Sequence, residues 1–137
     1  MSADRYTLVI PARAEYLLLA RLALTGVARL ARSDEEALAD LRLAVTEAAA
    51  NACRHAYEDG EGSITIHLTL GPDGGLEVVV EDDGPGFDQA SVSEWRADEL
   101  GEDGMGLAII RAVANDVDIG PRANGTGTRL RFTRSLR

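Results

Sequence analysis

A carboxylate and an amide four residues apart, Glu47 and Asn51, are the first residues of this chain whose types and spacing could do chemistry. On a helix, this spacing places both side chains on one face, with their Cβ atoms roughly 5–6 Å apart. Carboxylate and amide oxygens are hard ligands that can hold Mg²⁺ or a water molecule. An exposed polar pair is the commoner explanation of such a spacing. The residues around the pair are small and would let a ligand approach closely: Ala44, Val45, Ala48, Ala49, Ala50 and Ala52.

A second candidate is the segment Glu-Asp-Asp-Gly-Pro-Gly-Phe at residues 81–87, which follows an expected strand. Gly84 and Gly86 let the backbone turn sharply and approach a ligand without a Cβ in the way. Asp82, at the strand end, can accept a hydrogen bond from an exocyclic amine. A plain turn uses the same residue types, so this segment predicts a ligand site only together with other motifs.

A third candidate is the pair Gly104 and Gly106, separated by Met105, directly before a helix expected over residues 107–114. Free backbone N–H groups at a helix start, with the positive end of the helix dipole, form a ready anion site. An acidic stretch precedes the pair, since residues 81–103 hold nine acids and one arginine. On charge alone, a solvated acidic loop explains that stretch equally well.

Apolar periodicity predicts the helices that would position these residues. The first covers residues 13–32 and is partly amphipathic, with one face formed by Leu17, Leu18, Arg21, Leu22, Thr25 and Leu30. Ser33 is the expected N-cap of the second helix, and Glu36 completes a capping box. This helix runs to about Tyr57, and its apolar stripe consists of Leu38, Leu41, Val45, Ala48 and Ala52.

Five strands are expected, at residues 6–11, 64–70, 76–81, 117–119 and 128–133. The second and third form a hairpin across the glycine-rich connection 71–75. Because strands and helices do not alternate regularly, a doubly wound parallel sheet is disfavoured. The order of elements predicts instead an α/β (α+β) fold with a mixed, largely antiparallel sheet and helices packed on one face.

The amino-acid composition excludes several classes of function. The chain has 137 residues, which predicts one domain over residues 1–137, and its net charge of −9 disfavours direct nucleic-acid binding. All 14 basic residues are arginine, which excludes a P-loop and a Schiff-base lysine. The single Cys53 and two histidines offer no zinc motif. With no signal peptide and no long apolar run, the chain is expected to be cytoplasmic and not membrane-bound.

The three motifs in this order resemble those of the GHKL (histidine-kinase-like) ATPase superfamily: E-x-x-x-N, D-x-G-x-G and G-x-G-L. The run from Leu41 to Tyr57 is similar to the N-box of the bacterial anti-sigma factor serine kinases, and Gly125–Thr133 is similar to their closing strand. The resemblance covers nearly the whole chain, from the first strand to residue 136. It implies a two-layer sandwich of the Bergerat ATP-binding type.

The resemblance also implies roles for the polar residues. Glu47 matches the general base, Asn51 the Mg²⁺ ligand that bridges the phosphates, and Asp82 the reader of the adenine amine. Thr128 matches the threonine that supports the adenine through Asp82 or a water molecule. His55 falls where this subfamily often has histidine, and it is expected at the pocket rim or in helix packing.

The glycine motifs complete the implied ATP/ADP site. Gly84 and Gly86 shape the base pocket, while Gly104, Met105, Gly106 and Leu107 match the phosphate-contacting end of the ATP lid. One departure is that Glu102 and Asp103 precede Gly104, where several relatives have a basic residue. Charge stabilisation of the transferring phosphoryl group would then rest on Mg²⁺ and helix-terminal N–H groups.

The function implied by the resemblance is an ATP-binding anti-sigma factor with serine/threonine protein kinase activity. Such a protein phosphorylates an anti-sigma factor antagonist and sequesters a sigma factor, and its homodimerisation is implied by the resemblance alone. The alternative is a non-catalytic module that binds nucleotide as a structural ligand. Glu47 favours the kinase, whereas the acidic pair before Gly104 favours the binding module.

Overall fold

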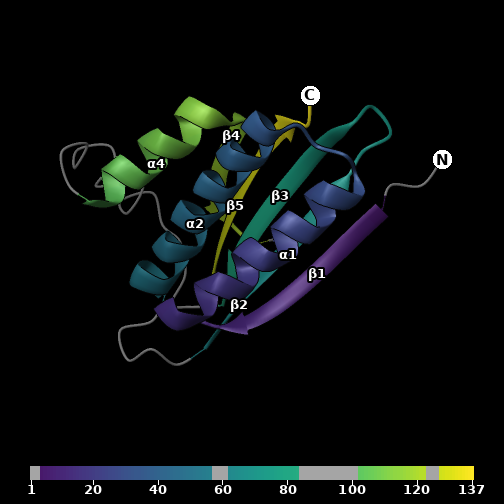
Figure 1. Cartoon of the computed structure of the whole chain (residues 1–137). Coiled ribbons are helices and arrows are strands. Elements are labelled where there is room, and N and C mark those ends of the chain that lie inside the picture. Colours follow the sequence, from purple (N-terminus) through teal and green to yellow (C-terminus); the bar gives the residue numbers. More distant parts are fainter. Residues whose placement is uncertain (1–3, 57–61, 84–101, 123–126) are drawn as a thin grey trace.

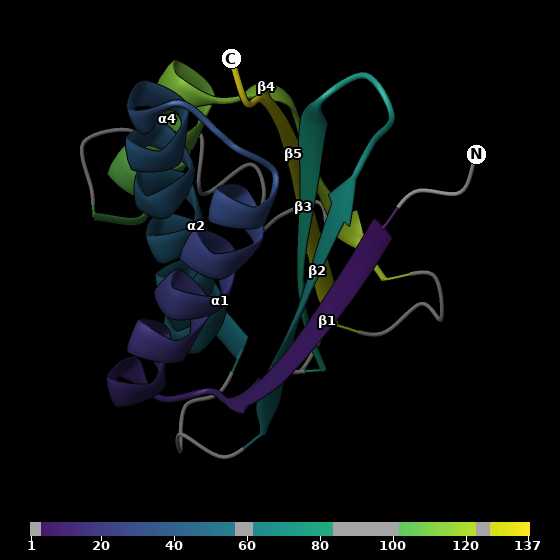
Figure 2. The ribbon, with the colours of Figure 1, turned by 45° about the vertical axis from the view of Figure 1, so that its right-hand side comes forward.

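The protein is a two-layer α+β fold, with a five-stranded antiparallel sheet covered by helices on one face (Figures 1 and 2). The computed structural model describes residues 4–56, 62–83, 102–122 and 127–137, excluding the side chains of residues 54–56 and 102–105. The strands, in sheet order, are β1 (Asp4–Pro11), β2 (Ser63–Leu70), β3 (Gly75–Asp82), β5 (Thr128–Ser135) and β4 (Asn115–Pro121). The helices are the short 3₁₀ helix η1 (Ala14–Tyr16), α1 (Leu17–Leu30), α2 (Glu35–Ala56) and α4 (Glu102–Val113). All four strand pairs are antiparallel, so the predicted fold class is confirmed.

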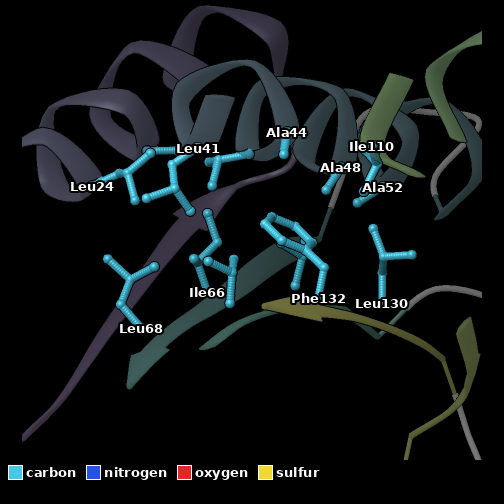
Figure 3. Packing of buried hydrophobic residues seen from close by; sticks show 14 of the residues in the cluster. Leu24, Leu41, Ala44, Ala48, Ala52, Ile66, Leu68, Ile110, Leu130 and Phe132 are labelled. Atoms are coloured by element: carbon cyan, nitrogen blue, oxygen red, sulfur yellow. The ribbon is translucent and has the colours of Figure 1, made fainter. Parts of the chain in front are cut away.

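The core lies between the sheet and the helices and is almost entirely aliphatic, as Figure 3 shows. Strand alternation turns Ile64, Ile66 and Leu68 of β2 toward the helices, and each is at most 3% exposed. Phe132 of β5 is fully buried at the centre of this layer. The predicted stripe of α2 is confirmed, because all five of its residues are buried.

Helix α1 buries a different face from the one predicted. Its buried residues are Ala20, Leu24, Val27 and Ala28, whereas Leu18, Leu22 and Leu30 are more than half exposed. The small residues Ala20 and Ala28 let α1 lie close to its neighbours, and Leu24 is the one leucine of α1 that is fully buried. The prediction failed because hydrophobicity alone does not show which of several apolar faces meets the neighbouring helix.

The start of α2 also differs from the prediction. The N-cap is Asp34, whose Oδ1 accepts a hydrogen bond from the Ala37 backbone N–H at 2.8 Å. The first helical hydrogen bond likewise runs from the Leu38 N–H to the Asp34 carbonyl oxygen. The predicted Ser33–Glu36 capping box is therefore wrong by one residue, because aspartate caps a helix as well as serine does.

Each edge of the sheet ends in proline. β1, which pairs with β2, ends at Pro11, and β4, which pairs with β5, ends at Pro121. The register of β4 shifts between Asn115 and Asp118, and Asp116 within this bulge has a φ of 52°. Among the described helices, none is long and apolar enough to cross a bilayer.

Candidate nucleotide site

A pocket between α2 and the sheet brings together residues from four elements. Its α2 wall consists of Ala48, Asn51 and Ala52, and its sheet wall consists of Val80, Asp82, Ile119, Thr128 and Leu130. Figure 3 shows Ala48 and Ala52 directed from α2 toward the sheet, near Leu130. Alanine side chains leave space between the two layers that leucines would fill. The walls are therefore apolar, with a few convergent polar groups, as is usual for a small-molecule site.

Two of those polar groups, Asp82 and Thr128, come from neighbouring strands. Asp82 is the last residue of β3 and lies opposite Thr128, the first residue of β5, in the strand register. The Asp82 side chain is 6% exposed and lines the pocket. The structure thus brings together the predicted reader of the adenine amine and its predicted supporting threonine.

Gly127 makes this arrangement possible, although it is not among the predicted site residues. Its φ is +76°, a left-handed conformation that favours glycine. A Cβ at this position would overlap the carbonyl oxygen of Asp82. Only glycine therefore lets β5 begin beside the end of β3. Before the strand register is known, a sequence cannot show that this glycine faces Asp82.

Glu47 and Asn51 converge on the backbone of α4. A Cβ placed on Gly106 would lie 3.0 Å from Glu47 Oε2 and 3.3 Å from Asn51 Oδ1. Both side chains therefore face the same point, which confirms that the four-residue spacing puts them on one helix face. Asn51 is 5% exposed and Glu47 is half-buried. A larger residue at position 106 would push directly against both polar groups.

Helix α4 begins at Glu102, five residues before the predicted start at Leu107. Gly104 is consequently in the first turn, where backbone N–H groups lack an intrahelical acceptor and remain available to an anion. Gly106 follows two residues after Gly104. Leu107 is buried in the core and packs α4 against the rest of the protein.

Four other predicted site residues lie outside what the structure describes. Gly84 and Gly86 fall in the segment 84–101, and the side chains of His55 and Met105 are not among those described. Their predicted roles stay predictions.

The chemistry of the donors fits Mg²⁺ bound together with a phosphate-bearing ligand. Within the described residues there is no group of three His, Cys, Asp or Glu side chains that could hold a metal by itself. Mg²⁺ commonly uses only one or two protein oxygens and completes its shell with water and phosphate. Asn51 Oδ1, beside the Glu47 carboxylate, matches that requirement.

A larger hollow, of about 560 Å³, lies at the opposite end of the sheet. It is lined by the β2–β3 turn, the start of β4 and the end of β5, including Asp73, Asp116 and Thr133. None of the predicted site residues lines it. Size alone would select this hollow, but the convergence of buried polar groups selects the pocket beside α2.

Comparison with known proteins identifies the family of this chain. Residues 10–134 match the model of the family described as histidine kinase-like ATPase domain. The serine-protein kinase RsbW of Listeria monocytogenes (serotype 4a, strain HCC23) is 38% identical over 125 residues, covering 85% of this chain and 79% of the relative. RsbW of Bacillus subtilis (strain 168) is 33% identical over 144 residues, covering 98% and 88% respectively.

Solved structures show the same fold. The crystal structure of the RsbU and RsbW domains of a Mycobacterium tuberculosis protein superposes with a TM-score of 0.72 and 23% identity. The match covers 97% of this chain and 32% of that one. A blue-light activated histidine kinase of Erythrobacter litoralis gives a TM-score of 0.63, at 25% identity, over 93% of this chain and 42% of that one.

The chain belongs to the family of histidine kinase-like ATPase domains, whose members share this sheet and the helices on one face of it. Within that family it is an ATP-binding serine/threonine protein kinase of the anti-sigma factor type, like the RsbW proteins.

Proposed function

We propose that ATP binds in the pocket between α2 and the sheet, with its base against Asp82 and Thr128. The Asp82 carboxylate accepts a hydrogen bond from the exocyclic amine of adenine, and the apolar walls exclude water from that bond. The first turn of α4, which contains Gly104, lies at the phosphate end, where its free N–H groups attract negative charge. The observation that carries this proposal is the convergence of Glu47 and Asn51 on one point beside Gly106.

Glu47 is the proposed general base and Asn51 the proposed Mg²⁺ ligand. The Glu47 carboxylate accepts the proton of a serine or threonine hydroxyl as that oxygen bonds to the γ-phosphorus. The bond from the γ-phosphorus to the β,γ-bridging oxygen breaks, and ADP leaves. Asn51 would hold the metal through its amide oxygen, and the bound metal would supply charge neutralisation on the phosphates. Because the chain contains no lysine, the N–H groups of the α4 first turn supply the remaining stabilisation.

The proposed protein substrate is an anti-sigma factor antagonist that carries the acceptor serine or threonine. The proposed second partner is a sigma factor, which the kinase sequesters without chemical change. These partners are proposed on the basis of the similarity to RsbW.

A second copy of the chain is the proposed partner for the outer face of α1. Leu18, Leu19, Leu22 and Leu30 of this helix are 43–77% exposed. Clustered exposed leucines are typical of a protein interface.

Leu22→Glu should shift the protein from dimer to monomer in sedimentation velocity. The control is Leu43→Glu, which makes the same change at a leucine on α2 that is 43% exposed, against 57% for Leu22, and it should leave the dimer intact. Equal behaviour of the two variants would contradict the proposed interface.

The test of the catalytic assignment is a pair of substitutions on α2. Glu47→Gln keeps the size of the side chain but removes the base, so phosphotransfer to the antagonist should fall by roughly 10²-fold or more. Mg·ATP affinity should change only a few-fold, and sigma factor binding should persist. Asn51→Ala should instead weaken Mg·ATP binding itself, because a metal ligand is lost.

Glu36→Gln is the matched control, since it makes the same chemical change at an exposed position on the same helix. It should leave both binding and phosphotransfer unchanged. Wild-type phosphotransfer by Glu47→Gln would show that Glu47 is not the base.

A further inference from the structure

An ion pair on the open face of the sheet lies directly behind the nucleotide pocket. Arg122, the residue after β4, places its Nε 3.4 Å from Oε2 of Glu81. The two side chains are only 27% and 16% exposed. Glu81 immediately precedes Asp82 in β3, and successive side chains of a strand point to opposite faces. Asp82 therefore reaches into the pocket while Glu81 is held on the other side of the sheet.

The aliphatic part of the Arg122 side chain also lies against Gly127, the glycine that packs on the Asp82 backbone. A Cβ on Gly127 would lie 2.9 Å from Arg122 Cδ and would overlap the carbonyl oxygen of Asp82. Arg122 therefore has two contacts near the end of β3. Its guanidinium pairs with Glu81, and its Cδ lies beside Gly127, which is in contact with the Asp82 backbone.

The second carboxylate oxygen of Glu81 also has a partner. Its Oε1 lies 3.0 Å from His67 Nε2 on β2, and His67 Nδ1 lies 3.0 Å from Thr7 Oγ1 on β1. Interactions at both carboxylate oxygens restrict the rotamers of Glu81 and link the end of β3 to β2 on one side and to Arg122 on the other.

We propose that Arg122 is a positioning residue for base recognition. It touches no nucleotide; it holds Glu81, and so keeps the Asp82 carboxylate aimed at the exocyclic amine. The inference rests on the proposed role of Asp82. Its consequence is specific, because loss of Arg122 should weaken recognition of the amine more than it weakens binding of the phosphates.

The structure supplies a control ion pair on the same face of β3. Arg131 Nε of β5 lies 2.7 Å from Glu77 Oε2 of β3, and these side chains are 31% and 35% exposed. Glu77 lies four residues before Glu81, away from the pocket. Removing this pair costs the sheet an ionic contact that is shorter than the Arg122–Glu81 pair, without touching the end of β3.

The experiment is calorimetric titration with Mg·ADP and with Mg·IDP, whose base lacks the exocyclic amine. Wild type should prefer ADP by about tenfold or more, the scale of one hydrogen bond to a charged group. Arg122→Ala should lose about three- to tenfold in ADP affinity and change less than about twofold for IDP, so that the preference shrinks. Arg122→Lys should recover part of the preference, and Arg131→Ala should retain all of it.

Asp82→Ala separates this inference from the proposed function. If Asp82→Ala keeps the wild-type preference for ADP, the proposed adenine contact is wrong. If Asp82→Ala loses the preference while Arg122→Ala keeps it, the positioning role of Arg122 is overturned. Equal losses for ADP and IDP in Arg122→Ala overturn it too, because they indicate a general structural effect. Should Arg122→Ala not fold, Glu81→Gln removes the same charge pair with little change in shape and is judged by the same ratio.

Discussion

The two faces of the sheet differ in how they are stabilised. The face under the helices presents Ile66, Val78 and Phe132, which are buried almost completely. The open face presents alternate residues of the same strands, among them Glu77 and Glu81 of β3, which pair with Arg131 of β5 and with Arg122 after β4. Burial of apolar area stabilises a fold far more than partly exposed ion pairs do. The comparison indicates that stability is concentrated on the inner face, whereas the ionic layer adjusts local geometry.

The largest effect is expected for Phe132→Ala on the inner face. Loss of a fully buried aromatic side chain leaves a cavity and should lower the free energy of unfolding by about 3–5 kcal/mol. Urea denaturation monitored by circular dichroism measures this change. Val79→Ala, on the opposite face of the neighbouring strand, removes fewer atoms from a side chain that is 5% exposed and should cost less. A loss below about 1 kcal/mol for Phe132→Ala would contradict the assignment of the core to this face.

An intermediate effect, on nucleotide affinity, is expected for Asp82→Ala. Asp82 is a buried polar residue on the inner face, where the other buried residues of β3 are apolar. Loss of the acceptor should weaken Mg·ADP binding by about 1–3 kcal/mol. Calorimetric titration measures the affinity, and circular dichroism checks that the variant is folded. Asp118→Ala is the control, because it removes the same charge from an exposed position on β4. Unchanged affinity in a folded Asp82→Ala protein would refute the site.

The smallest effect is expected for Arg131→Ala on the open face. Its ion pair with Glu77 is about one third exposed, so breaking it should lower the free energy of unfolding by only about 0–1 kcal/mol. Repeating the urea denaturation at high salt should shrink the difference further, since salt screens exposed pairs. A loss as large as that for Phe132→Ala would remove the distinction between the two faces.

Much of the inner face could be predicted from the sequence, because period-two and helical patterns report burial directly. The β2–β3 hairpin, the stripe of α2 and the antiparallel sheet follow from such patterns. The shared face of Glu47 and Asn51 follows from helix geometry alone. These features depend on residues close together in the chain.

The features that were missed depend on contacts between residues far apart. The exposed leucines of α1 could not be distinguished from a buried stripe, since the packing of α1 decides which face is covered. The closeness of Gly127 to Asp82 follows from the pairing of β3 with β5, more than forty residues apart in the chain. The closeness of Arg122 to Glu81 also needs the pairing of β4 with β5. Without the register, the glycine before β5 is indistinguishable from an ordinary turn residue.

The ends of the two edge strands affect how the protein behaves at high concentration. An unpaired strand edge offers N–H and carbonyl groups to another chain and can start fibre formation. Pro11 and Pro121 lack the N–H that an incoming strand would need, and the bulge at Asp116 breaks the regular spacing along β4. Charged residues lie on both edges as well, with Arg5 on β1 and Asp118 on β4. These edges disfavour strand-by-strand aggregation, so a concentrated stock of the folded kinase should resist thioflavin-positive fibre growth.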